Sequence, residues 1–159
     1  MVTSNVLTLA DIDLAATRTL LARYGLVLTV VADGEPIPGS YWGAPEAGVI
    51  AATVHARADT PVHSLLHEAC HLIVAPPERR AAIHTDASDS QAEEDAACYL
   101  QILLGGELAD VGRERLMADM DAWGYSFRLG NARAWFERDA NDSHAWLAQR
   151  RLLPQAHPT

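Results

Sequence analysis

Residues 61–75 read Pro-Val-His-Ser-Leu-Leu-His-Glu-Ala-Cys-His-Leu-Ile-Val-Ala, and the interpretation of the rest of the chain starts from this stretch. Apolar residues recur in it at the three- and four-residue spacing of a buried helix, with Pro61 near the first turn and Pro76-Pro77 beyond the end. We therefore expect one helix in the interior of the protein. His67 and His71 stand four residues apart on it, so their rings project from the same face.

The segments before this helix predict a small sheet with one covering helix. Residues 9–24 have the spacing of an amphipathic helix, with Thr8 as its cap. Residues 26–31 are rich in branched side chains and predict a strand, and shorter strands are expected at 40–42 and 49–56.

The segments after it predict mainly helices. Ser90 precedes Glu93 at the spacing of a capping box, so a helix is expected from about Gln91 to Leu104, ending at Gly105-Gly106. The sequence therefore predicts an α+β fold, in which a small sheet packs with helices and a glutamate-bearing helix follows the histidine helix. A helical C-terminal region completes it, with helices at 107–122, 131–140 and 142–151 and a connection at 123–130.

Length and composition favour one domain over residues 1–159. The chain has 159 residues, of which 49% are hydrophobic, enough for one ordinary core. Neither a signal peptide nor a long apolar run is visible, so we expect no membrane segment and a cytoplasmic location. The formal charge of −9 disfavours contact with phosphate backbones, so no nucleic acid partner is expected. The two cysteines, Cys70 and Cys98, are interpreted as buried thiols.

The pattern His-Glu-x-x-His is typical of a zinc site. Two imidazole nitrogens from His67 and His71 can converge on one ion, while Glu68 is placed to accept a proton from a water that the metal activates. A catalytic zinc site needs a third protein ligand as well. The extended motif, which adds a third histidine, is excluded. It requires glycine at position 74 and histidine at position 77, where this chain has Val74 and Pro77.

A carboxylate from the next helix is the remaining common solution. Glu93 supplies one, with the small residues Ala96 and Ala97 on its side of the helix where two helices must approach closely. Glu94 is the alternative ligand, because neighbouring helix positions differ by about 100° in direction. Asp95 is expected to be a solvated acid of the first turn.

On these residues the chain resembles the zincin metallopeptidases, specifically the glutamate-ligand (gluzincin) branch that includes the ImmA/IrrE-type proteins. That family pairs His-Glu-x-x-His with a later helix of the form Glu-x-x-Ala-Asn-x-x-Ala that ends in Leu-Leu-Met-Pro. The resemblance covers residues 49–106, puts the ligand at Glu93 and matches Leu103-Leu104 to the paired leucines. Two departures are Ala97, where the family often has asparagine, and Gly105-Gly106 in place of Met-Pro. The first removes a possible partner for a histidine ligand, so that partner must come from elsewhere.

This resemblance implies one Zn²⁺ per chain, a polypeptide substrate, and a strand near 49–56 that borders the cleft and offers its free edge to an extended peptide. The expected function is zinc-dependent hydrolysis of peptide bonds, with Glu68 as the general base. The alternative is a non-catalytic zinc-stabilised binding or regulatory module, in which a fourth side chain such as His63 or Cys70 excludes water. Hydrolysis of a non-peptide amide, as in the peptide deformylases, would require an upstream Glu-Gly-Cys segment that this chain lacks.

Several other residues are weaker candidates. His63 is expected either to line the cleft or to lie at the surface, and His55 and His84 are expected to be structural and loop residues. Spacing does not choose among four possible donors to an oxyanion, which are Tyr99, Tyr125, Arg128 and His144. Four aromatic residues are expected to be core residues of the C-terminal helices: Trp123, Trp135, Phe136 and Trp146.

Overall fold

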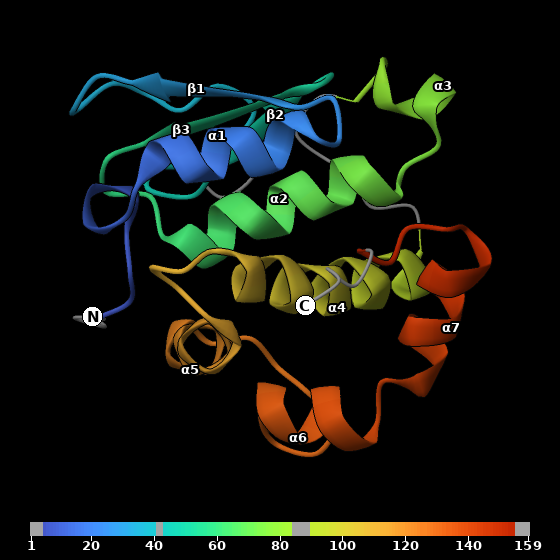
Figure 1. The fold of residues 1–159 in the computed structure, drawn as a ribbon. Helices are drawn as coiled ribbons and strands as arrows, with labels where there is room; N and C mark the ends of the chain where they lie inside the picture. The colour runs from blue at the N-terminus through green and yellow to red at the C-terminus, as the bar shows by residue number, and fades with distance from the viewer. Residues whose placement is uncertain (1–4, 41–42, 84–89, 155–159) are drawn as a thin grey trace.

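The computed structural model describes residues 5–40, 43–83 and 90–154, and it has the expected α+β architecture. Figure 1 shows a small sheet with helices α1 (Leu14–Ala22) and α2 (Val62–Val74) against one of its faces, and α4 (Gln91–Glu107) packed beneath α2. On the other side of α4 lie the C-terminal helices α5 (Arg113–Trp123), α6 (Ala132–Arg138) and α7 (Asn141–Gln149). Helix α2 is therefore enclosed between the sheet and α4.

The sheet has three strands in the described part of the chain: β1 (Val27–Val31), β2 (Gly48–Ile50) and β3 (Thr53–Arg57). Their order is β1-β3-β2, with β1 parallel and β2 antiparallel to β3. The expected strand at 49–56 is wrong, because these residues form the β2–β3 hairpin. Ala51 turns the chain there with φ +51°, and nothing in the run of apolar residues signals that turn.

The outer edge of β2 is covered by a strap, residues 37–40. Ser40 pairs with Gly48 in an antiparallel bridge, and at the other end of the strand the Ala51 N–H donates to the Ile83 carbonyl at 2.8 Å. A Cβ on Gly48 would lie 2.1 Å from a main-chain oxygen of the strap, so the two backbones touch. The free edge expected for peptide pairing is thus largely occupied. The predicted strand at 40–42 is seen only as the Ser40 bridge, and residues 41–42 lie outside the described residues.

The predicted helix at 9–24 is divided into two pieces. A 3-10 turn, η1 (Leu9–Asp11), comes first, Ile12 is extended, and α1 begins only after Asp13, whose side chain accepts from the Ala15 N–H at 2.9 Å. Asp13, and not Thr8, caps α1, because its carboxylate accepts a hydrogen bond from a free amide of the first turn.

Helix α2 has the predicted extent, and α4 is longer than predicted. Ser90 caps α4 by accepting from the Glu93 N–H, but the helix continues through Gly105-Gly106 to Glu107. A Cβ on Gly105 would lie 2.5 Å from Leu116 of α5, so this glycine allows a close helix contact rather than a stop. A further short helix, α3 (Pro77–Arg80), lies between α2 and α4 and was not predicted.

Within the described ranges, no helix is both long enough and apolar enough to cross a bilayer.

Candidate functional site

Helix α2 brings two imidazoles together near its middle. The Nε2 atoms of His67 and His71 lie 3.1 Å apart, and the two ring centroids are 4.6 Å apart. This closeness follows from helical geometry, since residues four apart stack on one face. His71 is buried and His67 is half-buried, so the paired nitrogens face the interior boundary between α2 and α4.

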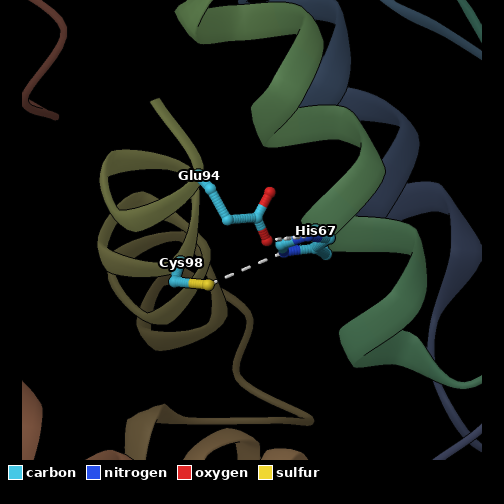
Figure 2. Close-up of side chains that lie close together, drawn as sticks. All are labelled: His67, Glu94 and Cys98. Carbon is cyan, nitrogen blue, oxygen red and sulfur yellow. Dashed lines mark hydrogen bonds and ion pairs between the residues drawn. The ribbon is translucent and has the colours of Figure 1, made fainter. Parts of the chain in front are cut away.

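Glu94, from the first turn of α4, completes the group. Its Oε1 lies 3.0 Å from His67 Nε2 and its Oε2 lies 2.7 Å from His71 Nε2. Figure 2 shows the carboxylate of Glu94 directed from α4 toward His67 on α2. Three donor groups from two helices therefore converge on one point.

Glu93, the carboxylate expected at this point, lies elsewhere. Both of its oxygens are bound by the guanidinium of Arg79, one of them at 3.0 Å from Nη1, and the side chain is buried. The carboxylate that faces the histidines is Glu94, and the expectation of Glu93 at this point is wrong. The reason is the angular step of about 100° per residue, which turns Glu93 toward α3 when Glu94 points at α2.

The charges of this group attract a cation. Burial alone lowers the pKa of His67, but Tyr125, Cys98 and Glu94 outweigh burial and raise that pKa well above its ordinary value. Burial likewise raises the pKa of Glu94, while hydrogen bonds with His67 and His71 outweigh it and bring that pKa far below its ordinary value. A carboxylate facing two imidazole nitrogens needs positive charge between them, which either a proton on an imidazole or a divalent metal supplies. Two imidazoles and one carboxylate are ligands that suit Zn²⁺, so these residues fit the ion.

Glu68 lies beside the group on the wall of an open hollow of about 410 Å³, here called the central hollow. Burial raises the pKa of Glu68, and Glu94 and Glu46 raise it further against the opposing effect of the two histidines. A raised pKa suits a carboxylate that must take up and return a proton. The lining residues of the central hollow are Glu46, Ser64, His67, Glu68, Glu94, Trp123, Gly124 and Tyr125.

A second hollow, of about 490 Å³ and here called the side hollow, shares Glu94 and Tyr125 with the first. Its walls come from α4 and from the C-terminal region, including Phe127, Arg128 and Trp135. The two hollows thus adjoin at Glu94 and Tyr125.

Gln101 supplies the hydrogen-bond partner of His67 that Ala97 cannot provide. Its Oε1 lies 3.0 Å from His67 Nδ1, and its Nε2 donates to the main-chain carbonyl of His63 at 2.7 Å. Sequence reasoning missed Gln101, although it lies two helical turns after Glu94 on the same face of α4, and a polar residue at such a position is a usable signal.

Cys98 brings a sulfur atom close to the site. Its Sγ lies 4.0 Å from His67 Nδ1, and His67, Glu94 and Cys98 each offer a ligand atom within 4.8 Å of the other two (Figure 2). The two side chains considered as a fourth ligand are placed differently. Cys70 is fully buried in the core, and His63 Nδ1 lies 3.1 Å from the hydroxyl of Tyr125.

Glu46 and Ser64 were also missed by sequence reasoning. The Ser64 hydroxyl donates to Glu46 Oε2, and the Trp123 indole N–H donates to Glu46 Oε1 at 2.7 Å. Glu46 thereby joins the loop before β2 to α2 and to the end of α5. Its position in a loop between Pro45 and Gly48 carries no spacing signal.

The candidates for an oxyanion donor are separated by the structure. Tyr125 borders both hollows, but its hydroxyl lies inward against His63, and burial raises its pKa. Arg128 lines the side hollow and forms an ion pair with Asp139. Tyr99 of α4 stacks on Phe136 with centroids 4.7 Å apart, and His144 of α7 packs against the same tyrosine, so both side chains lie where α4 packs against the C-terminal helices.

The remaining expected residues are mostly structural. Trp135 is a buried core residue, as predicted, and Phe136 and Trp146 are half-buried against the core, whereas Trp123 lines the central hollow. Asp95 borders the side hollow and accepts a hydrogen bond from Gln91. His55 lies on β3, where burial lowers its pKa, and His84 lies outside the described residues.

Comparison with known proteins identifies no relative: no family model, no curated protein and no solved structure matches this chain.

Proposed function

We propose that this chain is a zinc-dependent hydrolase of peptide bonds, with one Zn²⁺ held by His67, His71 and Glu94 and with Glu68 as general base. The observation that carries the proposal is the convergence of two Nε2 atoms and one carboxylate within 3.1 Å of one another. Glu68 opens onto the same hollow as two of these ligands. Three protein ligands and an accessible space are typical of catalytic rather than structural zinc sites.

The chemistry divides between the metal and the chain. Bound there, zinc would lower the pKa of a water toward ~7 and polarise the scissile carbonyl. Glu68 accepts the proton of the attacking water and returns it to the nitrogen of the leaving amine. Its burial favours the protonated form that this second step requires.

The two hollows favour a polypeptide as substrate. They share Glu94 and Tyr125 in their walls, so together they offer adjoining space for more than one residue of an extended chain. The proposal keeps the resemblance to the ImmA/IrrE-type gluzincins, with the glutamate ligand moved to position 94. Two free buried thiols favour the cytoplasm as the location, and the acidic charge of −9 disfavours nucleic acid as a partner.

The first experiment is the metal content of the purified protein by elemental mass spectrometry. We expect one zinc per chain in the wild type, loss of that zinc in Glu94→Ala, and retention in Glu93→Ala, the matched control one position away. Metal-free wild type that also fails to take up added zinc would overturn the proposal. Zinc lost in Glu93→Ala and kept in Glu94→Ala would overturn the ligand set.

A non-catalytic zinc-stabilised binding or regulatory module is the second candidate, and Cys98 is the observation that favours it. Its sulfur is close enough to His67 and Glu94 to be a further ligand, which would close the site to water. Cobalt substitution separates the two functions. Thiolate-to-cobalt charge-transfer absorption that disappears in Cys98→Ala supports the closed module, and its absence in the wild type supports the hydrolase.

A further inference from the structure

Gln101 is a polar side chain in the middle of the interface between α2 and α4. It is fully buried, although the helix around it is largely apolar on this side. An amide costs free energy to bury unless its hydrogen-bonding groups find partners. Both ends of the Gln101 amide do so, and both partners belong to α2.

These contacts require a hydrogen on Nδ1 of His67. The main-chain carbonyl of His63 can only accept, so the Gln101 nitrogen must face it and the Gln101 oxygen must face His67. An amide oxygen can only accept, and His67 Nδ1 must therefore carry a hydrogen. Nε2 lies 3.0 Å from the Glu94 carboxylate, which also only accepts, so Nε2 carries a second hydrogen that a bound metal would replace.

We propose that Gln101 is the positioning residue that keeps a hydrogen on Nδ1 of His67 and fixes the orientation of its ring. Its consequence for catalysis rests on the proposed zinc hydrolase, but the hydrogen bond does not. Gln101 does not touch the reacting atoms. It acts through His67 by directing Nε2 toward Glu94, where a metal would bind.

Ala97 explains why the partner comes from position 101. Side chains on a helix lean toward its N-terminus, so Gln101 reaches back over position 97, one turn earlier. Ala97 is fully buried and small, which leaves room for the longer glutamine. The chain therefore places an amide next to His67 without the asparagine that the family pattern has at 97.

The same amide also reaches the wall of the hollows. The Tyr125 hydroxyl lies 3.4 Å from Gln101 Nε2 and 3.1 Å from His63 Nδ1. The ring of Tyr125 packs edge-on against His67 with centroids 5.7 Å apart. Gln101 thus connects the orientation of a proposed ligand to a residue that borders both hollows.

The test is ¹⁵N NMR of the histidine rings in metal-free protein, which detects a hydrogen on each ring nitrogen directly. We expect a slowly exchanging Nδ1–H on His67 in the wild type, and loss of that protection in Gln101→Leu. Cys98→Ala is the matched control, because Cys98 is the other side chain near Nδ1. It should leave the Nδ1–H protected. A wild-type Nδ1 without a hydrogen, or protection that is lost in Cys98→Ala and not in Gln101→Leu, would overturn the proposal.

Zinc affinity, measured by competition with a chelator, gives the second readout. Gln101→Leu should weaken binding about 10- to 100-fold, the usual cost of losing the partner of a histidine ligand. Unchanged affinity in that variant would refute the positioning role. If the wild type shows the protected Nδ1–H but binds no zinc, the hydrolase fails and the hydrogen bond from His67 to Gln101 stands.

Discussion

At the residue scale, Glu68 is the side chain on which turnover should depend. We expect Glu68→Gln to keep one zinc per chain and to lose about 10²- to 10⁴-fold in kcat, the usual contribution of a general base. Glutamine fills the same space but cannot take up the proton. Turnover can be measured with a fluorogenic peptide library, and Glu78→Gln on α3, which is exposed, is the matched control. Full activity in zinc-loaded Glu68→Gln would remove this residue from the mechanism.

His63 predicts how stability depends on pH. It is fully buried, and burial first and the charge of His67 second lower its pKa to about 3, from the ordinary value of 6.5. Because the folded pKa lies below the unfolded one, the unfolded chain takes up the proton first. The stabilisation is therefore present above about pH 6.5 and is lost as the pH falls toward 3.

We expect the free energy of unfolding to fall by up to about 1.4 kcal/mol more per pH unit in the wild type than in His63→Leu over this window. Urea unfolding of metal-free protein between pH 7 and pH 5 measures it. Parallel pH curves for the two proteins would contradict a neutral buried His63.

At the element scale, the two glycines near the end of α4 should behave in opposite ways. Gly105→Ala should lower the free energy of unfolding by about 1–3 kcal/mol, because the new Cβ would overlap Leu116 in the packed core. Gly106→Ala would meet only the flexible, exposed Arg113 and should gain up to about 1 kcal/mol of helix propensity. Urea denaturation of the pair checks the prediction, and equal effects would refute the close contact with α5.

The elements with strong local signals were predictable from the sequence. Helix α2 has a long apolar period and prolines near both ends, and β1 is a branched run, so tertiary contacts had little left to decide. The β2–β3 hairpin was not predictable, because Ala51 and Ala52 turn the chain without a glycine, proline or asparagine. The end of α4 was predicted too early. Gly105 was interpreted as a stop signal, but it lies inside the helix and allows close packing against Leu116.

The candidate site was predictable in its residue types more than in its register. His67, Glu68 and His71 are contiguous on one helix, so their spacing alone brings them together. Which of two adjacent glutamates faces them depends on the rotation of α4 about its axis, and that rotation is set by packing against α2. Arg79 then binds the glutamate that is turned away.

At the scale of the whole molecule, the proposed ligands join α2 to α4 and should couple metal binding to global stability. Zinc at about 100 times its Kd adds about 2.7 kcal/mol to the folded state. For a chain of this length that corresponds to a rise in Tm of about 5–10 °C. Scanning fluorimetry with and without chelator should show the rise in the wild type and not in Glu94→Ala. An equal rise in both proteins would place the zinc elsewhere.

The strap over β2 has a consequence for how a substrate would be selected. A peptidase that takes its substrate as an added strand reads mainly the main chain and tolerates many sequences. Here Ser40 already occupies the outer edge of β2 at Gly48, so a bound peptide has little of that edge to pair with. Recognition would then rely on side chains entering the two hollows. On that basis the proposed enzyme should cut few sequences and leave most unfolded proteins intact.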